Sequence, residues 1–103
     1  MIPLTLDPAL HHPARLQIAT VLANVQSAEF ARLREIVQVS DSVLSKHLSA
    51  MGGAGYVKLD KVASDGRQRT WASFTKIGRK AFAGHMRSLH ALIRDAEQAV
   101  AAE

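Results

Sequence analysis

Apolar residues recur at helical spacing in the first quarter of the chain. Their positions are Leu10, Ala14, Ile18, Val21, Leu22 and Val25. Side chains three and four residues apart lie on one face of a helix. Asp7 and Pro8 are typical of a helix start, because aspartate caps the first turn and proline fits its first position. We therefore predict a first helix from Asp7-Pro8, which Pro13 bends or restarts, and a break over 24–27.

Two shorter helices are predicted next, joined by the turn 38–40. The first follows extended backbone at 29–31 and carries apolar residues at Phe30, Leu33, Ile36 and Val37. The second begins after Ser40, whose hydroxyl can accept from first-turn amides, and Asp41 suits the positive end of the helix dipole. Its core side is predicted to be Leu44, Leu48 and Met51. Gly52, Gly53 and Gly55 are expected to end it, because glycine tolerates left-handed backbone.

Alternation of polar and apolar residues replaces the helical period from residue 56. Residues 56–62 place Val57 and Leu59 on one side, which predicts a half-buried strand. Residues 64–66 have the chemistry of a turn, and 70–74 form the return strand. Thr75 caps a final helix, and Ile77 is expected to pack its first turn on the domain.

This order of elements is mainly α with a small β-hairpin, an α+β class. Two short helices joined by a tight turn and followed by a hairpin are the layout of a winged helix-turn-helix. With 103 residues, the chain is predicted to be one domain over 1–103, in which 75–103 form the C-terminal helix.

Composition narrows the class of protein further. Hydrophobic residues make up 48% and charged residues 21%, as in globular domains. The chain has no cysteine, which excludes disulfides, thiolate metal sites and a cysteine nucleophile. No apolar run approaches the roughly 18 residues of a membrane span, and the N-terminus is unlike a signal peptide. We expect a cytoplasmic, nucleoid-associated protein with no membrane partner.

Positive charge is concentrated in one part of the chain. Residues 42–87 hold nine basic and two acidic side chains, a net charge of +7, whereas the remainder carries −3. A basic block in a small domain indicates a polyanionic partner, and the alternative is a solvated basic face.

The third predicted helix has an exposed face suited to DNA. Small hydroxyl side chains let a helix lie deep in the major groove and bond to base edges, and a valine can touch a thymine methyl. The alternative is a serine-rich surface helix without a partner. Two hairpin arginines can contact phosphates or a narrow minor groove, with Asp65 bracing the first of them. His47, at the edge of the core side, is expected to be structural or to contact a phosphate. The predicted DNA-binding residues are Ser40, Ser42, Val43, Ser45, Lys46, His47, Ser49, Arg67 and Arg69.

These segments resemble a known family. Residues 40–48 (SDSVLSKHL) and 54–57 (AGYV) resemble the recognition helix and first wing strand of winged-helix bacterial transcription regulators. Residues 65–67 (DGR) and 74–78 (FTKIG) are similar to the wing of the MarR-like group, in its short single-domain form. The resemblance covers residues 6–93 and implies a homodimer on a partly palindromic operator of double-stranded DNA, with room for an unidentified small-molecule effector. Gly52-Gly53 departs from the family, which has helix formers there, and implies a looser last turn.

Three alternatives to a sequence-specific regulator remain open. ArsR-type metal sensors resemble the chain in fold, but residues 37–39 (VQV) stand where others carry a thiolate pair. His85 and His90, five residues apart, do not share a helix face as zinc ligands would. A winged helix that docks an acidic protein, and an RNA-binding or non-specific nucleoid module, are the other two. No catalytic motif is present, so we predict no enzyme, cofactor or metal.

The final helix carries a regular apolar seam. Its members, Phe82, Met86, Leu89, Ile93, Ala96 and Val100, are spaced 4, 3, 4, 3, 4. This heptad spacing is typical of helices that pack on one another. We predict that the seam is the homodimer interface, joined by Leu4 and Leu6. The alternative is a helix that folds back over its own domain.

Overall fold

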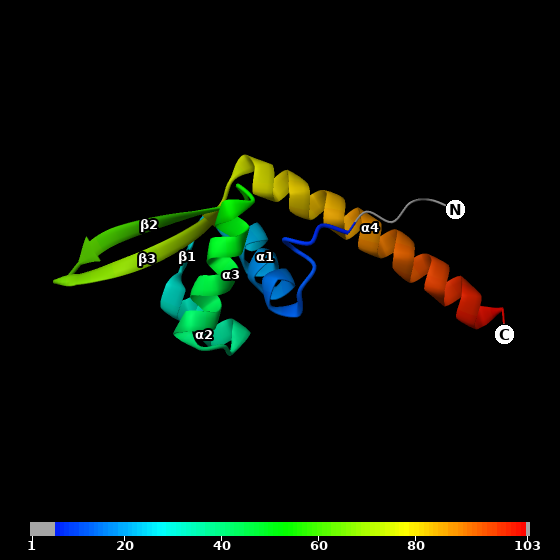
Figure 1. Cartoon of the computed structure of the whole chain (residues 1–103), viewed down its shortest axis with the longest axis horizontal. Helices are drawn as coiled ribbons and strands as arrows, with labels where there is room; N and C mark the ends of the chain where they lie inside the picture. Colours follow the sequence, from blue (N-terminus) through cyan, green and yellow to red (C-terminus); the bar gives the residue numbers. More distant parts are fainter. Residues whose placement is uncertain (1–5, 103) are drawn as a thin grey trace.

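The computed structural model describes residues 6–102, in which three helices are flanked by a projecting hairpin and a long helix (Figure 1). The hairpin extends to one side of the helices and the long helix to the other, and the chain spans 61 × 25 × 21 Å. The elements are α1 (Pro13–Asn24), β1 (Ala28–Glu29), α2 (Phe30–Val37), α3 (Asp41–Gly53), β2 (Val57–Ser64), β3 (Arg67–Phe74) and α4 (Lys76–Ala101). The predicted α+β winged-helix architecture is confirmed.

The core lies between α1, α2 and α3. Its fully buried large side chains are Leu10, Ile18, Leu22, Leu33, Leu44, Leu48 and Met51. Complete burial of each contributes about 1.5–3 kcal/mol, so this cluster fixes how the three helices pack. All seven belong to the predicted helical patterns. Val25 and Ile36, predicted to share those faces, are 39% and 43% exposed because they lie at the edges of the packed surfaces.

The predicted start of the first helix at Asp7-Pro8 is wrong. The helix begins at Pro13, and His12 caps it, with Nδ1 accepting from the Ala14 amide at 3.1 Å. Pro13 disfavours helical backbone at the residue before it, and His12 is accordingly extended at φ −151°. Asp7 instead closes a separate turn, where its Oδ1 accepts from the Ala9 amide at 2.9 Å.

The sheet has three antiparallel strands in the order β1-β3-β2. β1 pairs Ala28 with Ala72 and Glu29 with Trp71, and is too short to show any period in the sequence. At the hairpin tip Ser64 pairs with Arg67 around the two-residue turn Asp65-Gly66, with φ of 52° and 75°. Positive φ at both central residues defines a type I′ turn, whose twist matches that of the two flanking strands. Asp-Gly is among the sequences that this turn prefers.

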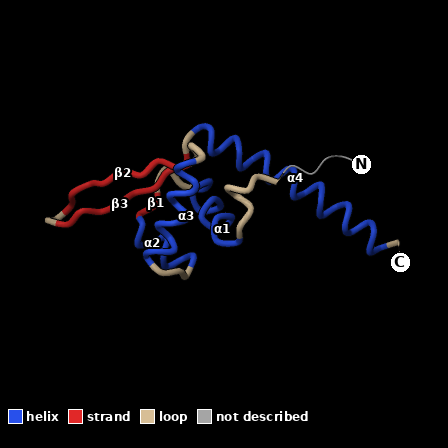
Figure 2. The backbone as a smooth tube through the Cα atoms, in the orientation of Figure 1, coloured by secondary structure: helices blue, strands red, loops and turns tan. Residues whose placement is uncertain are grey.

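The hairpin is more exposed than its alternation predicted. Only Val57 is buried in β2, whereas Leu59 is 44% and Val62 48% exposed. β2 leaves the domain after its first residue and β3 returns to it only in its last residues, so no element covers either face of the outer hairpin (Figure 2). The expectation of a half-buried strand is therefore wrong beyond Val57.

The first turn of α4 packs through a different residue from the one predicted. Ile77 is 64% exposed, whereas Gly78 is buried directly against the Tyr56 carbonyl. Thr75 caps the helix as predicted, because its Oγ1 accepts from the Gly78 amide at 2.9 Å. The cap and the Tyr56 contact together set the direction in which α4 leaves the domain.

The outer half of α4 extends away from the helical domain (Figure 2). The predicted seam is half-buried at Phe82, Met86 and Leu89, and Ile93 and Val100 are 49% and 71% exposed. Within the described chain α4 does not fold back over its own domain. Leu4, predicted to join the seam, lies outside the described residues.

Candidate nucleic-acid interface

The core-facing residues of α3 leave its opposite side in solvent. Leu44, Leu48 and Met51 are at most 1% exposed and fix the rotation of the helix. The predicted DNA-contacting residues of α3 that are exposed are Ser42, Val43, Ser45, Lys46 and Ser49. The structure therefore gathers them on one open face of small polar groups.

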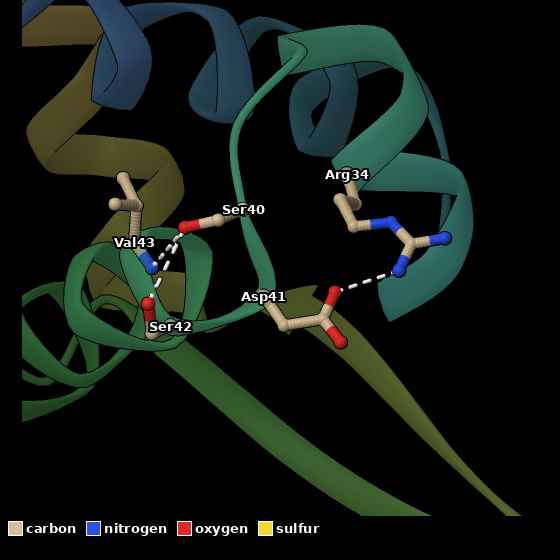
Figure 3. A network of polar contacts seen from close by, with 5 residues as sticks. All are labelled: Arg34, Ser40, Asp41, Ser42 and Val43. Carbon is tan, nitrogen blue, oxygen red and sulfur yellow. Dashed lines mark hydrogen bonds and ion pairs between the residues drawn. The ribbon is translucent and has the colours of Figure 1, made fainter.

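The start of α3 is held by three polar contacts (Figure 3). Ser40 Oγ accepts from the Val43 amide at 3.2 Å and lies 3.3 Å from Ser42 Oγ, which confirms the predicted N-cap. Asp41 Oδ1 accepts from Arg34 Nη1 at 2.7 Å, across the turn between α2 and α3. This hydrogen bond and the charge of Asp41 raise the pKa of Arg34 above its ordinary value. Sequence spacing alone gave no sign of this pair.

The two wing arginines occupy different environments. Arg67 begins β3 at the exposed tip, beside the turn. Arg69 is half-buried, and its Nη1 lies 3.2 Å from Glu29 Oε2 on β1. Among the described residues Arg69 Nε is buried without a hydrogen-bond partner, and no ion pair joins Asp65 to Arg67. Arg69 thus ties the wing to β1, and Arg67 is the arginine presented at the tip.

His47 lies on the inner side of α3 rather than on its open face. It is 8% exposed, and its Nδ1 accepts from Arg15 Nε at 3.1 Å. The His12 ring packs against it with centroids 4.5 Å apart. Burial lowers the pKa of His47, and positive charge on His12, Arg15 and Lys46 lowers it further. This environment favours the structural role for His47 over contact with DNA.

A second histidine pair joins the N-terminal segment to α4. His85 is 2% exposed, and its Nδ1 accepts from the Asp7 amide at 3.1 Å. Its Nε2 therefore carries the proton and donates to His11 Nδ1 at 3.3 Å. Burial lowers the pKa of His85, His11 adds to this effect, and Asp7 opposes it. The exposed pair His11-His12 thus connects the segment before α1 to both α4 and α3.

We expect the free energy of unfolding to fall as the pH drops below about 6.5. The pKa values of His47 and His85 are lowered in the folded protein, so the unfolded chain takes up these protons first. The stabilisation is complete above pH 6.5 and is lost as the pH falls towards the two folded pKa values. Urea unfolding between pH 8 and pH 5 measures this, and His85→Gln should flatten the dependence. A parent protein equally stable at both ends contradicts the prediction.

Other kinds of site find little support in the described part of the chain. Within residues 6–102 no three histidine or carboxylate side chains are close enough to share a metal ion. None of the helices described there is long and apolar enough to cross a membrane.

Comparison with known proteins identifies the family to which this fold belongs. Residues 14–93 match the family model described as a winged helix DNA-binding domain. An uncharacterized protein of Methanocaldococcus jannaschii is 29% identical over 83 residues, which cover 81% of this chain and 90% of that protein. The transcriptional regulator homologue of Pyrococcus horikoshii is similar in structure, with a TM-score of 0.80, 28% identity and coverage of 85% and 87% of the two chains. NadR, solved in complex with 4-hydroxyphenylacetate, has a TM-score of 0.69 and 20% identity, and the matched part covers 89% of this chain and 64% of NadR.

Proposed function

The chain belongs to the winged helix DNA-binding domain family, and from this we propose that it is a sequence-specific transcription regulator that binds a partly palindromic operator as a homodimer. The open face of α3 is the observation that carries the proposal. Its serines and Lys46 project away from a rigid core, and Asp41, the acidic residue of α3, is paired with Arg34. Such a face suits the major groove better than an ordinary solvated helix face, where glutamate and lysine pairs are common.

In the proposed complex α3 reads bases and the wing contacts the backbone. Ser42, Ser45 and Ser49 face base edges, and Val43 meets a thymine methyl. Arg67 at the exposed tip reaches a phosphate or the minor groove, where narrow A·T-rich sequence concentrates negative potential. Arg69 acts indirectly, because its pairing with Glu29 fixes the base of the wing.

The MarR-like subtype and a small-molecule effector belong to the same proposal. The resemblance of the wing segments supports the subtype. NadR was solved with a small aromatic acid, which supports an effector of comparable size for this chain. A metal-responsive regulator finds less support, because no three ligand side chains meet within residues 6–102.

Arg67→Ala should weaken binding to all duplexes, whereas Ser45→Ala should change which duplex is preferred. An arginine on a phosphate contributes about 0.9 to the slope of log affinity against log salt, and the proposed dimer carries two copies of Arg67, so the slope on the full operator should fall by about two units. Operators are selected from random duplexes, and affinity is measured by fluorescence anisotropy at several salt concentrations. Arg94→Ala, the same charge change on the exposed part of α4, serves as the control.

Two results would contradict the proposal. One is that both variants bind the selected operator as the parent does. The other is that the parent fails to prefer one site over bulk DNA by about 10³ or more, which would indicate a non-specific nucleic-acid module.

A further inference from the structure

Asp41 places a carboxylate at the end of α3 that approaches DNA. Its side chain is 67% exposed and directly precedes Ser42, a residue of the open face. Residues near the start of a recognition helix contact base edges and lie close to the phosphates. An unpaired carboxylate at this place would repel the nucleic acid. The same charge is favourable in the free protein, because it interacts with the positive end of the helix dipole.

Arg34, on the neighbouring helix α2, forms an ion pair with this carboxylate. It lies in the last turn of α2, where its carbonyl accepts from the Gln38 amide at 2.8 Å. Gln38 adopts left-handed backbone, φ 58°, and this turns the chain so that Asp41 returns beside Arg34. Figure 3 shows the guanidinium directed at the carboxylate across the turn. The pair spans the joint of the helix-turn-helix rather than a single helix.

We propose that Arg34 is a positioning residue for DNA binding, which neutralises Asp41 and holds the start of α3 at a distance and angle that a duplex accepts. The inference rests on the proposed function and adds a residue outside the open face. A positioning role differs from a direct phosphate contact in one testable respect: once the charge of Asp41 is removed, Arg34 is no longer needed for DNA binding.

A double-mutant cycle on the selected operator separates these roles. Arg34→Ala should weaken binding about tenfold, because the like charge of Asp41 then faces the phosphates. Asp41→Asn should bind as tightly as the parent or more tightly. The double variant should return to within about twofold of Asp41→Asn. Arg32→Ala is the matched control, because Arg32 pairs with Glu35 at 3.3 Å within α2 and does not reach α3.

The outcomes distinguish this inference from the function on which it rests. If Arg34→Ala binds as Arg32→Ala does, or if Asp41→Asn fails to rescue it, the positioning role is overturned. A drop of about two units in the salt slope on the full operator, one for each subunit, without rescue assigns Arg34 to a phosphate instead. A parent that binds no duplex selectively overturns the proposed function itself.

Discussion

Gly78→Ala is expected to destabilise the fold by about 3 kcal/mol or more, at the upper end of the cost of overpacking. A Cβ at this position would lie 2.2 Å from the Tyr56 carbonyl oxygen and 2.9 Å from Phe74 Cδ1. The carbonyl cannot withdraw freely, because it also accepts from the Thr75 amide at 2.9 Å. One methyl group therefore has to move the start of α4 away from the strands. The contact lies beside the start of β2 and the end of β3, so the substitution would shift α4 relative to the part of the sheet that joins the core.

Gly84→Ala supplies the control within the same helix. The nearest atom to its added Cβ is Arg87 Nη2 at 3.5 Å, the end of a flexible side chain. Alanine favours helix over glycine by about 1 kcal/mol, so this variant should be as stable as the parent or more stable. Urea unfolding followed by circular dichroism compares the two. If the urea midpoints of Gly78→Ala and Gly84→Ala were equal, the backbone around Gly78 would be able to relax and accept a Cβ, which contradicts the prediction.

The contrast between Gly78 and Ile77 shows what local patterns can predict. The spacing of Leu44, Leu48 and Met51 fixes a helix face because it depends only on the helical period, and all three are buried. Which residue of α4 meets the domain depends on the direction of approach, which Tyr56 and Thr75 determine. The sequence pattern alone therefore places the apolar Ile77, rather than the neighbouring glycine, against the domain, and this prediction is wrong.

The same distinction applies to the candidate site. The open serine face of α3 follows from the position of its core residues, so the sequence predicted it. The partners of Arg69 and His47 come from β1, α1 and the segment before α1, which are 32 to 40 residues distant in the sequence. Pairing of this kind depends on tertiary packing. It decides which of the predicted DNA-binding residues are committed to the protein's own structure.

Ile93→Glu is expected to convert a dimer into a monomer and to weaken operator binding on the order of 10²–10⁴-fold. α4 has 26 residues and is therefore about 39 Å long, yet its outer half extends away from the domain. Leu92, Ile93 and Val100 are 41%, 49% and 71% exposed in the single chain. The seam continues the heptad spacing of Phe82 to Leu89 into this exposed region, so a second copy of α4 is the partner that its period fits.

Dimerisation on this seam would give two recognition helices related by a twofold axis. On a palindrome with half-sites about 34 Å apart, binding at one half-site raises the effective concentration at the other. Ile93→Glu should therefore retain the parent's affinity for a single half-site while losing affinity for the full operator. Because Ile93 is half-exposed in the monomer, its replacement leaves the domain core intact.

Sedimentation equilibrium at micromolar concentration and anisotropy on full and half operators measure both effects. Gln98→Glu adds the same charge to an exposed position of α4 outside the seam, and should remain dimeric with unchanged affinity. The interface lies elsewhere if Ile93→Glu stays dimeric and matches Gln98→Glu on the full operator. A monomeric parent would mean that the seam has no second copy as its partner. Equal losses on the full and half operators would place the effect of Ile93 within one domain, because avidity acts only where two half-sites are bound together.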